Sequence, residues 1–151
     1  MSNWTTITAE DLKDTKVARL VEALQSAALG DGQFDPTDAI IADVVARIRA
    51  EIASCSTNQL DANTNTIPKD LHRLACRMVV RELQSRLQDP LGEDEREEQR
   101  NDLRYLERIA KCEVVVAQPD TPGESEVQQK GGVTVASTRT ARATRDEMEG
   151  L

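Results

Sequence analysis

The stretch from Ile67 to Leu87 constrains the fold of this chain most strongly, because it combines a clear helix start with a long apolar stripe. Pro68 suits a first helical turn, where its missing N–H is not needed, and Asp70 favours the positive end of a helix. The apolar residues that follow recur at three- and four-residue steps, as on one helix face: Leu71, Leu74, Ala75, Met78, Val79, Leu83 and Leu87. We expect a helix that begins at Pro68 and buries this face.

Three arginines run beside that stripe at four-residue intervals: Arg73, Arg77 and Arg81. Their natural partners are carboxylates, and an acidic cluster lies further along the chain: Glu93, Asp94, Glu95, Glu97, Glu98 and Asp102. One interpretation of this cluster is an exposed helix start that the helix dipole stabilises. The other is that it faces the arginines of a neighbouring copy, or a channel for DNA. We predict pairing between subunits, with pairing inside one chain as the alternative.

The remainder of residues 1–117 predicts three further helices. Thr8 resembles the N-cap of a first helix, which is either continuous or broken near Asp14. Asp35 has the position of a cap for a second helix with an apolar face, which we expect to pack on the central one. A polar loop follows over residues 54–66, and the last helix is expected over 95–111. The predicted fold is all-α: a small four-helix bundle followed by an extended C-terminal arm.

Composition limits both the core and the function. Aromatic residues make up only 2% of the chain, so the core must be aliphatic. The net charge of −8 argues against a protein whose main task is to grip nucleic-acid phosphates. The three cysteines, Cys55, Cys76 and Cys112, are odd in number and far apart, so we predict reduced thiols and neither a disulfide framework nor a zinc site.

The sequence has no recognisable catalytic or cofactor-binding motif. There is no nucleophile elbow, phosphate-binding loop or dinucleotide fingerprint. The acids between Asp31 and Asp38 lack the spacing of a calcium loop, and His72, the single histidine, has no matching ligand set. We therefore expect no enzyme activity, no cofactor and no metal. The start of the chain does not resemble a signal peptide and no window resembles a membrane span, so we expect synthesis in the cytosol.

The composition changes after Gln118, where prolines and glycines without apolar periodicity predict a linker over residues 118–132. Val133–Thr138 then alternates apolar and polar residues without a partner strand in the chain, so we expect it to join a sheet of another protein. Thr144–Glu147 has the form of a capping box for a short terminal helix. Residues 133–151 are thus either a disordered tail or, as we predict, a partner-binding arm that uses Val133, Val135, Arg139, Arg142, Arg145, Met148 and Leu151.

The order of these signals resembles a known family. An I-T-x-E-D-L segment precedes the capped amphipathic helix, I-P-x-x-L-x-R-L-A-C opens the central helix, and R-Y-L-E-R-I-A-K precedes a short run of valines. This pattern, from Trp4 to Ala117, resembles the head–tail connector (adaptor) proteins of tailed bacteriophages, in the Mu-like branch. Cys112 stands where that family often has glycine, and the tail after Pro119 is not part of the shared pattern.

The resemblance implies a structural protein of the virion neck. Such proteins are small helical bundles that form a twelve-fold ring beneath the portal protein and extend the channel through which DNA passes without specific binding. Their lower surface receives the next neck or tail protein, a stopper or a tail terminator. In such a ring we expect the channel wall to carry Glu93, Asp94, Glu95, Glu97 and Glu98, because like charge keeps a moving duplex from sticking. We expect the portal to receive the C-terminal arm.

A helical DNA-binding or regulatory protein is the alternative from another functional class. It would use the strip of Arg73, Arg77 and Arg81 to bind DNA. The acidic balance of the chain and the lack of a recognisable helix-turn-helix disfavour it.

Overall fold

The structure is a computed structural model that describes residues 2–15, 18–27, 32, 34–86 and 88–123. Its elements, in chain order, are β1 (Trp4–Thr6), α1 (Asp11–Thr15), α2 (Ala18–Ala27), α3 (Thr37–Ser54), β2 (Thr66–Pro68), a 3₁₀ turn (Lys69–Leu71), α4 (His72–Arg86) and α5 (Glu93–Ala110). The chain is mainly helical, as predicted. The described residues contain five α-helices, of which α1 and α2 correspond to the alternative of a first helix broken near Asp14. They also contain a small two-stranded sheet that we did not predict.

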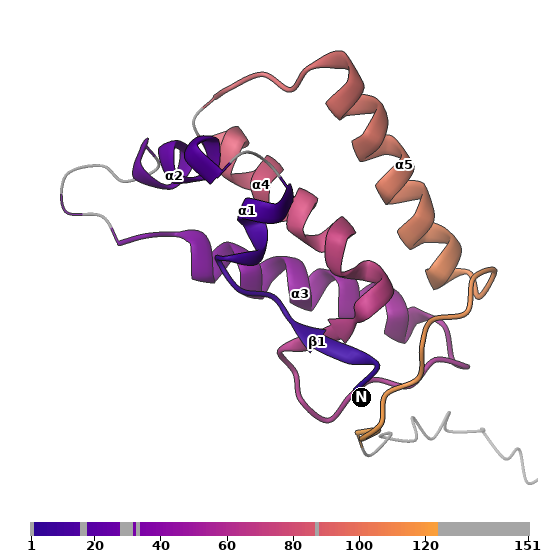
Figure 1. Ribbon diagram of the computed structural model, residues 1–151. Coiled ribbons are helices and arrows are strands. Elements are labelled where there is room, and N and C mark those ends of the chain that lie inside the picture. Colours follow the sequence, from indigo (N-terminus) through magenta and orange to yellow (C-terminus); the bar gives the residue numbers. More distant parts are fainter. Residues whose placement is uncertain (1, 16–17, 28–31, 33, 87, 124–151) are drawn as a thin grey trace, which may run out of the picture.

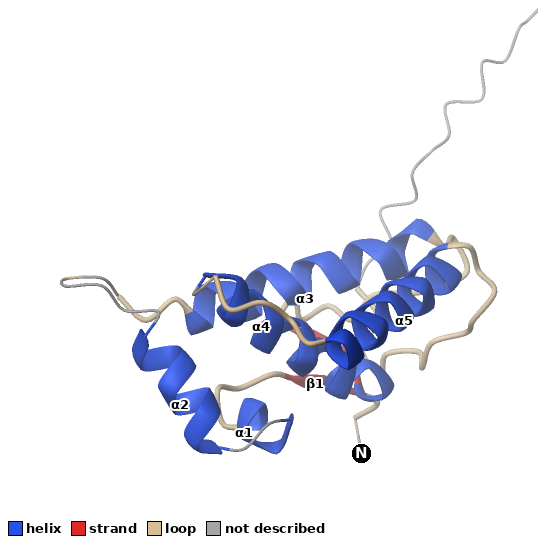
Figure 2. Ribbon diagram, turned by 90° about the horizontal axis from the view of Figure 1, so that it is seen from above, coloured by secondary structure: helices blue, strands red, loops and turns tan. Residues whose placement is uncertain are grey.

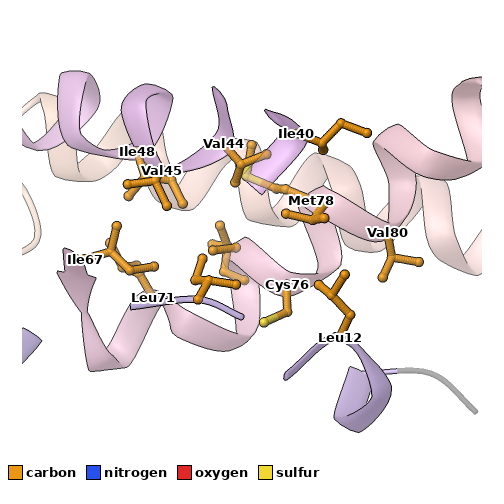
Figure 3. Packing of buried hydrophobic residues seen from close by; sticks show 14 of the residues in the cluster. Leu12, Ile40, Val44, Val45, Ile48, Ile67, Leu71, Cys76, Met78 and Val80 are labelled. Atoms are coloured by element: carbon orange, nitrogen blue, oxygen red, sulfur yellow. The ribbon is translucent and has the colours of Figure 1, made fainter. Parts of the chain in front are cut away.

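Helix α4 occupies the centre of the domain (Figure 1). Helices α1 and α2 pack on one side of it, and α3 packs on the other and also carries α5 (Figure 2). Because α4 is covered from both sides, it buries more than the predicted stripe. Figure 3 shows Cys76, on a second face of α4, beside Leu12 of α1. The members of the predicted stripe that are described are all buried: Leu71, Leu74, Ala75, Met78, Val79 and Leu83.

The partnership of α3 with α4 is also confirmed. The apolar face of α3 packs on α4 through five buried residues: Ile40, Val44, Val45, Ile48 and Ile52. The start of α3 is capped as the sequence predicts, because the Asp35 carboxylate accepts hydrogen bonds from the Thr37 N–H at 2.9 Å and from the Thr37 hydroxyl at 2.6 Å. The cap fixes where α3 begins, and the apolar period fixes which face it buries.

The central helix begins later than we predicted. Pro68 is not in a first helical turn but ends β2, with an extended ψ of 137°. Strand β2 pairs antiparallel with β1, with Thr5 opposite Ile67, and the Lys69 N–H donates to the Asn3 carbonyl at 3.0 Å. Pro68 tolerates this position because its φ is fixed near the extended region and it has no N–H to leave unpaired. The N-terminal segment is thereby attached to the start of α4.

Helix α5 ends in a left-handed residue that is not glycine. Cys112 has a φ of 62°. Its N–H donates to the Ile109 carbonyl at 3.0 Å, and the Glu113 N–H donates to the Arg108 carbonyl at 2.9 Å. This pair of bonds is the Schellman motif, in which glycine is the usual residue because it has no Cβ. Glycine would adopt this φ without strain, whereas Cys112 carries a Cβ.

Candidate functional site

The three arginines of the predicted strip do not share one environment. Arg77 and Arg81 form a charge cluster with Glu98 and Asp102 of α5, which we call the α4–α5 cluster. Asp102 accepts from Arg77 Nε at 3.1 Å and from Arg81 Nη1 at 2.7 Å, and Glu98 accepts from Arg81 Nη2 at 2.9 Å. Arg73, by contrast, is exposed on α4. The intramolecular alternative therefore applies to Arg77 and Arg81.

Part of the α4–α5 cluster is shielded from solvent. The side chains of Arg81 and Asp102 are only 8% and 7% exposed, whereas that of Glu98 is 49% exposed. The hydrogen bonds that Arg77 donates to Asp102 raise the pKa of Arg77 above its ordinary value, because they stabilise the charged guanidinium. The cluster fixes α5 against α4, and inter-subunit contacts through the arginine strip stay a prediction.

The acidic start of α5 remains available to solvent. Glu93, Asp94 and Glu97 are exposed, while Glu95 accepts a hydrogen bond from the Gly92 N–H at 2.9 Å and thereby caps the helix. Figure 1 shows that this end of α5 is the end remote from β1. Of the five carboxylates that we predicted for a channel wall, the fifth, Glu98, belongs to the α4–α5 cluster. The other four are exposed or half-buried at the start of α5. Their facing a channel stays a prediction.

The expectation of three reduced thiols is wrong. Cys55 and Cys112 form a disulfide, and Cys76 is a buried cysteine outside that disulfide. Cys55 directly follows α3, and Cys112 is the second residue after α5. These two helices pack together, so their ends meet. The 57-residue separation of the two cysteines gives no sequence signal for this pairing.

Residues 113–123, which we call the C-terminal strap, pack back against the domain. Backbone hydrogen bonds join Ala62 N–H to the Thr121 carbonyl at 2.9 Å and Gly123 N–H to the Leu60 carbonyl at 2.8 Å. The Trp4 indole N–H donates to the Ala117 carbonyl at 2.8 Å. We expected a linker from residue 118 onward, but the contacts with the domain continue to Gly123. The seven residues of the predicted arm, from Val133 to Leu151, lie outside the described residues.

Arg49 organises the loop that receives the strap. Its guanidinium lies 5.4 Å from the centre of the Trp4 ring, a cation–π distance. Burial lowers its pKa, and the Asp61 carboxylate opposes that effect only in part. The guanidinium also donates to three backbone carbonyls, those of Asp61 at 2.8 Å, Asn63 at 3.0 Å and Thr66 at 2.8 Å. One side chain of α3 thereby holds three backbone carbonyls of the loop.

Asp61 makes the strap sensitive to acid. Its carboxylate accepts hydrogen bonds from the hydroxyls of Thr121 and Thr66, both at 2.6 Å, and these bonds hold its pKa below the ordinary value of 3.8. The unfolded chain therefore binds this proton more tightly than the folded one. The resulting stability is complete well above pH 3.8 and is lost as the pH falls through the folded-state pKa.

We predict that Asp61→Asn will flatten the acid limb of the stability curve. Between pH about 6 and pH about 3 the wild-type protein should lose more unfolding free energy than the variant, because only the wild type must protonate residue 61. Urea unfolding at both pH values measures the difference. Asp89→Asn, at an exposed site, is the control and should follow the wild type. Parallel curves for Asp61→Asn and wild type would contradict the prediction.

A pocket of about 260 Å³ lies between α3 and α4. Its lining combines three apolar residues with a charged rim: Ile40, Asp43, Val44, Arg47, Met78, Glu82 and Arg86. Among the described residues, no group of three or more histidine, cysteine or acidic side chains is placed to hold a metal ion. None of the described helices is both long and apolar enough to cross a bilayer.

Comparison with known proteins identifies the family. The family model described as bacteriophage Mu, Gp36 matches residues 7–136, which include α1 to α5 and the C-terminal strap. The match continues beyond Pro119, so our expectation that the tail lies outside the shared pattern is wrong as far as residue 136. Neither the curated proteins nor the solved structures gave a match to the chain. The chain is a phage protein and belongs to the bacteriophage Mu Gp36 family.

Proposed function

We propose that this protein is a structural head–tail adaptor that forms a ring under the portal and extends the DNA channel. The observation that carries the proposal is the family match over residues 7–136, which joins a small helical domain to the start of the C-terminal arm. A ring of twelve copies is the proposed assembly, and a stopper or tail terminator is the proposed partner on the tail side. The proposed location is the neck of the virion.

The surface charge supports a passive channel. Glu93, Asp94 and Glu97 are exposed at the free start of α5, where they would repel a passing duplex. A repelling wall lets DNA slide without specific binding. The alternative of a DNA-binding regulator loses support, because two of its three arginines, Arg77 and Arg81, are bonded to carboxylates of their own chain. We propose a structural role without catalysis.

The C-terminal strap defines how the arm can reach a partner. The strap ends at Gly123, whose N–H is bonded to the Leu60 carbonyl, so the 28 residues 124–151 follow a point that is fixed on the domain. Residues 124–132 alone can extend about 30 Å at roughly 3.3 Å per residue. We propose that the portal receives the arm, through the apolar and arginine residues between Val133 and Leu151.

The test compares the full chain with a chain that ends at Gly123. The shorter chain keeps every hydrogen bond of the strap, so we expect an unchanged thermal unfolding midpoint. We expect its affinity for purified portal rings to fall at least about tenfold, or about 1.4 kcal/mol. Co-sedimentation measures binding, and negative-stain images report whether a ring caps the portal.

Two further chains sharpen the result. Changing Arg139, Arg142 and Arg145 together to alanine in the full-length protein should weaken portal binding without altering the domain. Ending the chain at Pro119 removes the bonds of Thr121 to Asp61 and Ala62, so this chain should also unfold at a lower temperature. If the chain ending at Gly123 docks on the portal as well as the full chain does, the helical domain must carry the contact.

A further inference from the structure

Phe34 is the most exposed of the large apolar side chains in the described part of the chain. It is 96% exposed, compared with 83% for Val115, 43% for Leu20 and 36% for Tyr105. The side chain lies just before α3, where an apolar residue commonly packs on the first turn of the helix as a hydrophobic staple. Its exposure shows that Phe34 makes no such contact. A fully exposed phenyl ring leaves a large apolar area in water that a partner could bury.

The backbone next to Phe34 is held in place. Asp35 caps α3 through its two hydrogen bonds to Thr37, and Pro36, which is buried, has a φ of −78°. These constraints fix the chain on the C-terminal side of Phe34. The ring is therefore presented to solvent from a defined point at the start of α3.

The pocket between α3 and α4 is large enough to hold a phenyl ring. Its volume of about 260 Å³ exceeds the roughly 150 Å³ of an apolar cavity that holds benzene. Figure 3 shows Ile40 and Val44 of α3 together with Met78 of α4, and these three residues form its apolar floor. Two acidic and two arginine side chains complete the lining. An aromatic side chain can bury its ring on this floor while polar groups of its backbone face the charged rim.

The occupant cannot be Phe34 of the same chain in this conformation, because that side chain is 96% exposed. A second copy of the chain carries the same Phe34 side chain, next to the capped start of its own α3. A contact in which one surface of a copy meets a different surface of the next is heterologous, and such contacts generate rings when the rotation closes. We propose that Phe34 of one copy inserts into the α3–α4 pocket of the neighbouring copy. This inference rests on the proposed function, since it assigns one contact of the proposed ring.

Photo-crosslinking tests the contact directly. The full chain carrying Phe34→p-benzoylphenylalanine keeps an aromatic ring at the position and is mixed with isotopically labelled wild-type protein at assembly concentration. Illumination should join residue 34 of the unlabelled copy to labelled peptides that contain residues 40–47 or 78–86. The same photoreactive residue at Leu20, which is 43% exposed, is the matched control and should not label these peptides.

Assembly provides the second measurement. Phe34→Ala should raise the concentration needed for assembly at least about tenfold, as expected for loss of an aromatic anchor. Leu20→Ala should leave it unchanged, and both variants should keep the thermal midpoint of the wild-type monomer.

The outcomes separate this contact from the proposed function. Assembled particles without a crosslink from residue 34 to the pocket would overturn the contact and leave the adaptor proposal intact. A crosslink confined to the same chain, or to a portal added to the mixture, would overturn it as well. A protein that stays monomeric and gives no crosslink also overturns it, while portal binding by the full chain tests the adaptor role independently.

Discussion

Asp102→Ala is expected to lower the free energy of unfolding by about 3 kcal/mol or more, because it leaves the buried Arg81 guanidinium without its main partner. Arg81 is 8% exposed in its side chain and cannot regain water without moving α5. Glu98 remains as a second acceptor but is half exposed, which places the loss near the lower end of the range for a broken buried pair. Urea unfolding followed by circular dichroism measures the change.

Two variants make this result specific. Glu97→Ala on the same helix, at an exposed site, should change stability by less than about 0.5 kcal/mol. The double variant Arg81→Met with Asp102→Leu should recover much of the loss, because it removes the buried Arg81 charge together with its partner, while Arg77 is 22% exposed and keeps Glu98 at 3.3 Å. A loss below about 1 kcal/mol for Asp102→Ala would mean that water reaches Arg81 and that the α4–α5 cluster does not fix α5.

Loss of the disulfide between Cys55 and Cys112 should also have a large effect. The chain-entropy model assigns about 4 kcal/mol to a crosslink that closes a loop of this length, with a separation of 57 residues. Cys112→Ser should therefore unfold at a clearly lower urea concentration than the wild type. Adding a reductant should bring the wild type down to the level of the variant and leave the variant unchanged.

The conformation of Cys112 gives this experiment an internal control. Serine, like cysteine, is strained at a φ of 62°, whereas glycine is not. Cys112→Gly should consequently be more stable than Cys112→Ser by roughly 1 kcal/mol, although neither variant can form the disulfide. If reductant leaves the unfolding curve of the wild type unchanged, the crosslink does not contribute to stability in solution.

Local patterns were enough to predict the helical part of the fold. The apolar period of α4 and α3 identified the buried faces, and Asp35 identified the start of α3, because each signal lies within one element. The sheet was not predictable in the same way. Its strands are three residues each, and pairing Thr5 with Ile67 depends on tertiary packing over 62 residues of chain. Pro68 then suggested a helix start, although it ends a strand.

The candidate site shows the same division. The arginines and the acids of the α4–α5 cluster could be picked out from the sequence. The four-residue spacing of the arginines, however, does not show whether their carboxylate partners lie in the same chain or in another copy. Arg49 was within reach of prediction, since it follows Val45 by four residues on the buried side of α3. The disulfide was not, because Cys55 and Cys112 become neighbours only when α3 and α5 pack with their ends together.

The C-terminal strap has a consequence for how strongly an assembly could hold its partner. Because Gly123 is fixed beside Leu60, every copy in a closed ring would release residues 124–151 from an equivalent point on the same rim. Docking to a second ring would then be multivalent, with each bound arm raising the effective concentration of the next. A single arm could then bind weakly and exchange readily while the ring as a whole stayed bound. The lifetime of the complex between the two rings would be set by avidity and not by the affinity of one arm.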